Sequence, residues 1–181
     1  MTPTRDPIWA ELVQLIPVIS LALPFIVEGN VDIGRASWGF LLGALLTIPA
    51  TVAVVARRHL LNPILLGAGL WLWLGAIAFQ MPAPRVVAWL AETQAAGLFL
   101  GALAVGTVAT FLSPRGYIAC YCPDARWIRR SSLLLLGLTL LVAAWAWIFR
   151  HDVRLGGGLP FIVLNVARRA MARMGRGRSQ T

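Results

Sequence analysis

Charged residues are scarce in this chain: they make up 13% of its 181 residues, about half the share found in an average soluble domain. Acidic residues are the rarer sign, with 7 Asp and Glu against 16 basic residues, all of them arginine. No phosphate-binding loop, nucleophile elbow or paired-carboxylate motif is present. The sequence therefore predicts a protein that is not an enzyme.

Cysteine and histidine are also scarce, with two of each. Cys120 and Cys122 are one residue apart, which supplies half of a zinc site at best, and no histidine is near them. The spacing also disfavours an intrachain disulfide, so a reduced thiol pair is expected. His59 and His151 follow two apolar runs that end on opposite sides of a five-span arrangement, which argues against haem. No metal and no cofactor is predicted.

Apolar residues, in contrast, make up 59% of the chain. They are gathered in runs of roughly 16 to 25 residues, and an apolar helix needs about 20 residues to cross a bilayer core of about 30 Å. The sequence thus predicts an all-α, polytopic membrane helix bundle with about five transmembrane helices. The five runs are Leu12–Val27, Ala36–Ala56, Leu60–Pro84, Thr93–Pro114 and Ser131–Phe149.

The C-terminal part of the chain has a different pattern. Leu155–Ala167 contains about 13 residues, or about 20 Å as a helix, which is too short to span a bilayer. It is expected to form a re-entrant or interfacial helix, followed by a frayed basic tail. The chain is accordingly divided into a transmembrane bundle, residues 1–154, and a C-terminal segment, residues 155–181.

The net charge of +9 would suggest nucleic acid in a soluble protein. In a membrane protein, the positive-inside tendency of the loops explains it, so nucleic acid is not expected as a partner. The expected partners are the lipid bilayer with its anionic headgroups, and either a second copy of the chain or another membrane protein. The arginines expected to contact them are Arg57, Arg58, Arg129, Arg130, Arg168, Arg169, Arg173 and Arg176.

The arginines also bear on orientation. A cytoplasmic N-terminus places Arg57 and the basic interval Arg115–Arg130 inside, and the acidic turn Glu28–Asp32 outside. Five spans would then leave the arginines of the tail outside, against the same tendency. A return of Leu155–Ala167 through the bundle would remove the conflict. The orientation with a cytoplasmic N-terminus is favoured.

Small residues at four-residue spacing mark two of the apolar runs. Gly39 and Gly43 lie in one run, and Gly97 and Gly101, followed by Gly106, lie in another. Glycines at this spacing share a helix face and allow two backbones to approach closely. They indicate either a homodimer seam or packing of the two helices against each other, and the second interpretation is favoured.

Polar side chains near the ends of runs offer an alternative function. Glu92 and Gln94, and also Glu11, would form an ion or proton site if they lay deep in hydrocarbon, as in a small oligomeric transporter or channel subunit. Trp89, however, is typical of the aromatic belt at the membrane interface. Glu92 is then about one turn deeper, where it can reach the headgroups.

Several features follow one another in a suggestive order. Leu15-Ile16-Pro17 stands in the first run and Arg57-Arg58 ends the second, Ser113-Pro114-Arg115 ends the fourth, and Trp127 precedes a run that contains Trp145. In this order the chain resembles the bacterial inner-membrane family of intracellular septation protein A. It departs from that family at its end, because the family finishes with a full membrane helix.

The resemblance implies a multi-pass protein of the bacterial inner membrane with a role in the cell envelope and no catalytic residues. We therefore expect a non-enzymatic scaffold or accessory factor of a cell-envelope or membrane complex. The alternative is the transporter or channel subunit that would use Glu92 and Gln94.

Overall fold

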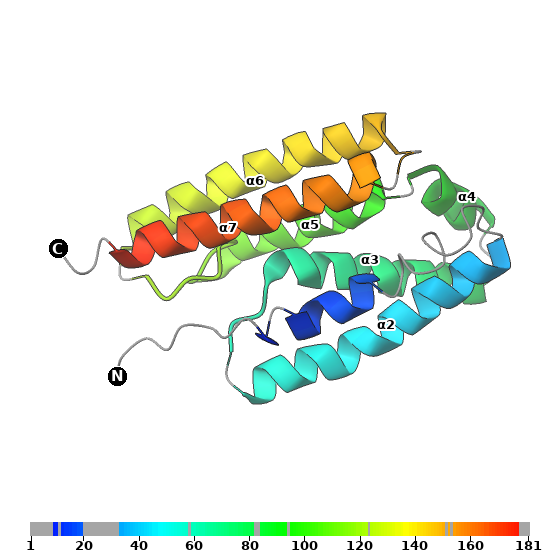
Figure 1. Cartoon of the computed structure of the whole chain (residues 1–181), viewed down its shortest axis with the longest axis horizontal. Coiled ribbons are helices and arrows are strands. Elements are labelled where there is room, and N and C mark those ends of the chain that lie inside the picture. The colour runs from blue at the N-terminus through cyan, green and yellow to red at the C-terminus, as the bar shows by residue number, and fades with distance from the viewer. Residues whose placement is uncertain are drawn as a thin grey trace.

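The computed structural model describes residues 9–10, 12–19, 33–57, 59–81, 84–93, 95–122, 124–150, 152 and 154–177, with residues 33–35 and 176 by backbone alone (Figure 1). The regular structure of these residues is entirely helical, which confirms the predicted all-α class. Residues 12–19 are helical, and six α-helices and a π-helical turn follow. They are α2 (Ile33–Ala56), α3 (Pro63–Gln80), α4 (Pro84–Thr93), α5 (Ala96–Leu112), α6 (Ala125–Ile148), η1 (Arg154–Gly158) and α7 (Leu159–Gly177).

Three of the described helices are long and apolar enough to cross a membrane: α2, through Ala36–Ala56, α3 and α6. A fourth span results if α4 and α5 are taken together, although their axes differ by 98°. The described part of the chain therefore has three to four candidate spans, and the predicted number of five is not confirmed. The predicted run Leu12–Val27 lies largely outside the described residues.

The helix boundaries follow from capping residues. Asn62 caps α3 by accepting a hydrogen bond from the Ile64 backbone N–H, and Pro63 occupies the first helical position, where its missing N–H costs nothing. Asp124 caps α6 through the backbone N–H groups of Arg126 and Trp127. This cap starts α6 six residues before the predicted Ser131, so the last six residues of the basic interval Arg115–Arg130 are helical rather than loop.

The helices form two layers, with α2, α3 and residues 12–19 in one and α5, α6 and α7 in the other (Figure 1). α3 packs between α2 and α5, and α6 packs against both α5 and α7. The close approach of α3 and α5 requires glycine, because a methyl group on Gly67 or Gly101 would overlap the backbone of the other helix. The largest core cluster lies between α5, α6 and α7, and Phe99, Leu135 and Leu164 are fully buried within it.

α7 differs from the predicted short apolar segment with a frayed tail. It is one helix of 19 residues that packs along α6, and the basic residues up to Gly177 belong to it. The turn before it is fixed by Asp152, which accepts hydrogen bonds from the backbone N–H groups of Arg154 and Leu155. α6 and α7 therefore form an antiparallel hairpin, and the C-terminal segment is part of the main core.

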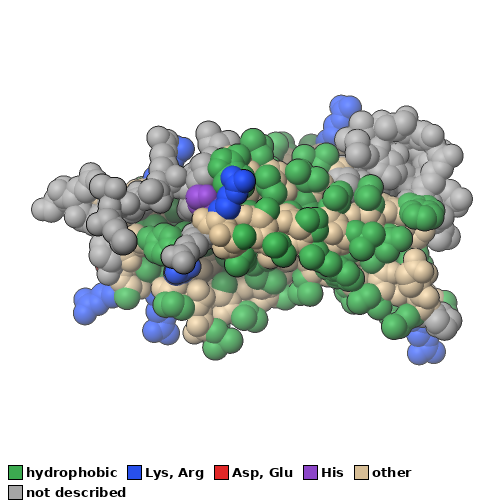
Figure 2. Space-filling view, turned by 90° about the horizontal axis from the view of Figure 1, so that it is seen from below, with side chains coloured by type: hydrophobic (Ala, Val, Ile, Leu, Met, Phe, Trp, Pro, Cys, Tyr) green, Lys and Arg blue, Asp and Glu red, His purple; other side chains and the backbone are tan. Residues whose placement is uncertain are grey.

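Large apolar side chains face outward along most of the molecule. Trp38, Leu112 and Leu141 are 71%, 79% and 69% exposed, respectively. Figure 2 shows hydrophobic side chains over most of one face, with basic side chains toward both ends and also near its middle. Continuous apolar surface of this extent is unusual for a soluble monomer and is compatible with a membrane protein.

Candidate functional site

The end of the molecule where α7 finishes and α6 begins gathers basic side chains, and we call it the arginine-rich end; α2 finishes toward the same side but nearer the middle of the long axis (Figure 1). The Trp127 indole N–H donates to the Met171 carbonyl (3.4 Å), which places the last turns of α7 beside the first turn of α6. The only described acidic residue at this end is Asp124, whose carboxylate is already used as the α6 cap. The exposed or partly exposed arginines are Arg57, Arg115, Arg126, Arg129, Arg130, Arg169 and Arg173.

The α6–α7 hairpin brings the arginines of α6 and α7 together, although they are far apart in the sequence. Arg57 follows α2, Arg129 and Arg130 lie on α6, and Arg169 and Arg173 lie on α7. Because α7 runs back to the start of α6, the arginines of the tail lie at the same end as those of the loops (Figure 1). The conflict that a five-span chain creates between tail and loops does not arise in this arrangement.

Aromatic rings hold two of the arginines in place. The Arg57 guanidinium lies 4.7 Å from the centre of the Trp9 ring, and Trp9 also contacts His59 edge to face. The Arg115 guanidinium lies 4.4 Å from the centre of the exposed Tyr121 ring. Such contacts orient a cation while leaving it able to meet an anion. Of the remaining predicted contact residues, Arg58 lies outside the described residues, and only the backbone of Arg176 is described.

Arg168 does not lie on the surface where a lipid contact was predicted. It is only 6% exposed, in the buried stripe of α7 that includes Leu164 and Ala172. These residues recur every four positions, so they share the face that packs against α6. The prediction of a headgroup contact for Arg168 is therefore corrected to an interior position.

Tyr117 lies near Arg168, in the loop between α5 and α6, and is completely buried. Its backbone N–H donates to the Ser132 hydroxyl (2.9 Å), and its own hydroxyl is hydrogen-bonded to that of Thr139 (3.2 Å). Gly106 of α5 makes room for the ring, since a methyl group there would lie 2.6 Å from it. The loop thus inserts a side chain between the helices.

The phenol of Tyr117 remains neutral over the physiological pH range. Burial raises its pKa to about 12, against the opposing effects of the Thr139 hydrogen bond and the positive charge of Arg168. Tyr117 is not predicted from the sequence, because it stands in a hydrophilic interval that suggests an exposed loop. The signal in the sequence is a pair of hydroxyl residues, Ser132 and Thr139, seven positions apart in the apolar helix α6. Both are buried, and a buried hydroxyl requires a polar partner.

A second polar network lies where α3 begins. The Asn62 backbone N–H donates to the Gln14 side chain (2.9 Å), and the Asn62 amide donates to the Asn165 side chain of α7 (2.8 Å). Gln14 and Asn165 in turn donate to the carbonyls of Ala10 and Phe161, so the network is closed within the protein. It ties Ala10 and Gln14 to the start of α3 and to α7.

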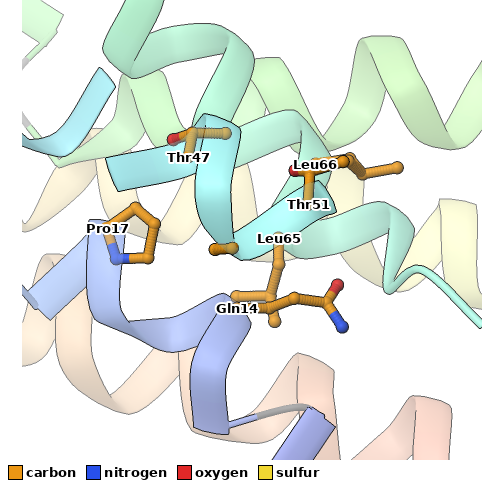
Figure 3. Close-up of a pocket in the computed structure, with 7 residues that line it drawn as sticks. Gln14, Pro17, Thr47, Thr51, Leu65 and Leu66 are labelled. Atoms are coloured by element: carbon orange, nitrogen blue, oxygen red, sulfur yellow. The ribbon is translucent and has the colours of Figure 1, made fainter. Parts of the chain in front are cut away.

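A small cavity adjoins this network (Figure 3). Its volume is about 10 Å³, which is room for about one water molecule. Residues 14 and 17, α2 and the start of α3 line it, through Gln14, Pro17, Thr47, Ala50, Thr51, Leu65 and Leu66. A substrate of ordinary size does not fit.

The predicted glycines are buried within this single chain. Gly43 faces Leu72 of α3, and Gly97 and Gly101 of α5 face Trp71 and Gly67 of α3. The favoured packing of the two glycine-bearing helices against each other is therefore not seen, because α3 lies between them. Gly39 is also buried, and Gly106 accommodates Tyr117.

Of the three polar residues of the transporter alternative, Glu92 alone lies among the described residues. Glu92 is exposed near the end of α4, which lies at the end of the molecule opposite to the arginine-rich end (Figure 1). Gln94 and Glu11 lie outside the described residues. The described residues contain no group of three or more His, Cys, Asp or Glu that could bind a metal.

Cys120 and Cys122 form a disulfide, which corrects the predicted reduced pair. Two residues of extended chain span about 7 Å, whereas the two Cα atoms are 5.4 Å apart, within the range that disulfides adopt. The chain is therefore bent at Tyr121. Ala119, just before the pair, has a left-handed backbone conformation (φ 50°) that starts this bend.

Comparison of the chain with protein-family models, with curated proteins and with solved structures finds no match.

Proposed function

We propose that this protein is a non-enzymatic, multi-pass protein of the bacterial inner membrane that serves as a scaffold or accessory factor of a cell-envelope complex. The observation that carries the proposal is the outward-facing apolar surface, bounded at one end by arginines from three separate helices or helix ends. The apolar surface suits acyl chains, and the arginine-rich end suits anionic headgroups or an acidic surface of a partner protein.

In this proposal α2, α3, α5 and α6 cross the membrane, and α7 returns beside α6. The arginine-rich end then faces the cytoplasm, in keeping with the positive-inside tendency of short loops. Trp145 and Trp147 near the end of α6, with the Arg150 guanidinium 4.9 Å from the Trp147 ring, belong to the aromatic belt of the opposite leaflet. Trp9 and the end of α7 both face the cytoplasm in this orientation.

The filled interior favours a scaffold over a transporter. The buried polar groups around Asn62 bond to one another, and the cavity beside them has room for a single water. Glu92, the described candidate for ion coupling, is exposed on α4. The order of sequence features that resembles the septation protein family also supports a role in the cell envelope.

Charge reversal at the two ends tests the proposal. Arg129→Glu combined with Arg130→Glu is expected to abolish cross-linking of the full-length protein to its membrane partner while the protein stays in the membrane fraction after alkaline extraction. The matched control, Arg150→Glu with Arg154→Glu at the opposite end, is expected to retain the cross-link. Release of the wild-type protein by alkaline extraction, or an unchanged cross-link in the first variant, would contradict the proposal.

A further inference from the structure

The Cys120–Cys122 disulfide closes a loop that contains one intervening residue, Tyr121. The stabilisation by a disulfide grows with the length of the loop that it closes, and this loop is among the shortest possible. The bond also joins two residues of one loop rather than two helices. Its contribution to the stability of the fold is therefore small, and another role accounts better for it.

The position of the disulfide is unusual for a structural bond. It lies at the arginine-rich end, which faces the cytoplasm in the proposed function, and this step rests on that orientation. Cytoplasmic thiols are kept reduced, and the disulfides that do form there are usually transient, as in catalysis or redox sensing. The orientation and the short loop together indicate a bond that opens and closes.

The two sulfur atoms have different surroundings. Cys120 is 3% exposed, and its Sγ lies 3.6 Å from the Ala172 carbonyl oxygen of α7, whereas Cys122 is partly exposed. The Cys120 sulfur has no proton while the disulfide exists, but as a thiol it can donate a hydrogen bond to that carbonyl. The site thus accommodates the reduced state as well as the oxidised one, and Cys122 is the sulfur that a reagent can reach.

The charge around the pair selects the reagent. The Arg115 guanidinium is held over the ring of Tyr121, the residue that stands between the two cysteines in the sequence. Other arginines lie at the same end of the molecule. A thiolate that also bears carboxylates is attracted to such a surface, and its local concentration rises. A thiolate without carboxylates carries a single negative charge and gains less from it.

We propose that Cys120–Cys122 is a redox-active disulfide that exchanges with a carboxylate-bearing, low-molecular-weight thiol of the glutathione class. The thiolate attacks Cys122 Sγ, the Cys120–Cys122 bond breaks, and Cys120 leaves with the electron pair and takes up a proton. A second thiolate then attacks the outer sulfur of the mixed disulfide, releasing Cys122. The sum is one protein disulfide and two thiols converted into two protein thiols and one small-molecule disulfide.

Equilibration of the purified full-length protein in detergent with mixtures of reduced and oxidised glutathione tests this directly. After acid quenching, a maleimide-polyethylene glycol reagent shifts the protein on a gel once per free thiol, and the chain has no cysteine besides these two. The expected result is a change from zero to two labelled thiols across these mixtures. A pair that stays fully oxidised or fully reduced in all mixtures overturns the proposal.

Single-cysteine variants test the order of attack. In Cys120→Ser the remaining Cys122 is expected to form a mixed disulfide with oxidised glutathione roughly tenfold faster than Cys120 does in Cys122→Ser, because Cys120 is buried. Mass spectrometry of timed samples measures both rates. Equal rates, or faster reaction of Cys120, contradict the assignment of Cys122 as the attacked sulfur.

Arg115→Gln tests the selection by charge. At low ionic strength it is expected to slow reduction by glutathione roughly two- to tenfold and to slow reduction by 2-mercaptoethanol, whose thiolate bears no carboxylate, distinctly less. Arg150→Gln at the opposite end is the matched control and should change neither rate. If Arg115→Gln slows both thiols equally, or slows neither, the proposed role of charge is wrong.

A membrane-impermeant maleimide applied to spheroplasts separates this proposal from the orientation on which it rests. No labelling of the reduced pair from outside is expected. Labelling from outside would show that the proposed orientation has failed, while the glutathione measurements in detergent would still decide whether the pair exchanges.

Discussion

The Tyr117 side chain connects three parts of the fold: the α5–α6 loop that carries it, α6 through Thr139, and α5 through Gly106. Its phenol is fully buried and its pKa is raised to about 12, so ionisation within the fold is opposed. In the unfolded chain a tyrosine ionises near pH 10. This difference links the stability of the protein to pH.

The stability contribution of Tyr117 is complete below pH 10 and is lost as the pH rises toward about 12, because only the unfolded chain ionises freely in that window. The difference corresponds to about 3 kcal/mol at most. We expect Tyr117→Phe to lose about 1 kcal/mol at neutral pH, for the missing hydrogen bond, and to lack this alkaline loss. Unfolding in detergent at pH 8, 10 and 12 measures both effects.

The Phe variant tests the role of the hydroxyl cleanly, because Thr139 keeps its hydrogen bond to the Leu135 carbonyl and is not left without an acceptor. Absorbance at 295 nm gives an independent readout: wild type should show a phenol that ionises near pH 12, absent from Tyr117→Phe. Identical alkaline stability profiles for the two proteins would contradict the buried position of the phenol.

The second prediction for a single residue concerns Gly101. A methyl group at this position would overlap the Gly67 carbonyl oxygen, so Gly101→Ala must push α3 and α5 apart. The expected loss is about 1–3 kcal/mol, measured as a lower unfolding midpoint in detergent. Gly137→Ala on α6 is the matched control, because the added methyl group meets nothing within 4 Å.

The control should be neutral or gain up to about 1 kcal/mol from helix propensity. Equal midpoints for Gly101→Ala and Gly137→Ala would falsify the close contact of α3 with α5. The sequence predicts that these glycines pack against helices but not which helix they meet, because four-residue spacing defines a face and not its partner.

At the scale of elements, the sequence predicts α2, α3 and α6 well, because each is a long apolar run bounded by capping residues or charges. Two elements could not be predicted in this way. The Thr93–Pro114 run is preceded by a separate helix, α4, whose axis differs from that of α5 by 98°, and no proline or glycine at positions 94 and 95 indicates this bend in the sequence. The basic part of α7 suggests a surface tail, because arginine is seldom buried.

The α6–α7 hairpin rests on the apolar stripe of α7, and Leu164 at its centre is completely buried. Leu164→Ala is expected to cost roughly 2–5 kcal/mol, because it removes packed methyl groups and leaves a cavity. Ile162→Ala, at a position that is 63% exposed, is the matched control and should cost much less. Denaturation in detergent distinguishes them, and similar losses would mean that α7 does not pack through this face.

For the whole molecule, the fold follows from the sequence as far as an apolar helical bundle, whereas the arginine-rich end does not. That end depends on the direction in which α7 runs, which the Asp152 cap and the glycine-rich π-helical turn determine locally and the α6 contact completes. Cys120–Cys122 is a similar case, because residue spacing alone gives no indication of the bend at Tyr121 that brings the two sulfur atoms together.

The last prediction follows from the direction in which α7 runs. Since α7 returns from the far end of α6 to the arginine-rich end, a chain that ends at Asp152 should leave its terminus on the opposite side of the membrane from the full-length chain. A fluorescent protein, active inside, and alkaline phosphatase, active outside, are fused in parallel to Thr181 and to Asp152. The full-length fusion is expected to fluoresce without phosphatase activity, and the shorter fusion to show the reverse. The same reporter active in both fusions would mean that α7 does not cross the membrane. That result would place the arginines of α7 apart from Arg129 and Arg130, against the observed contact between Trp127 and Met171.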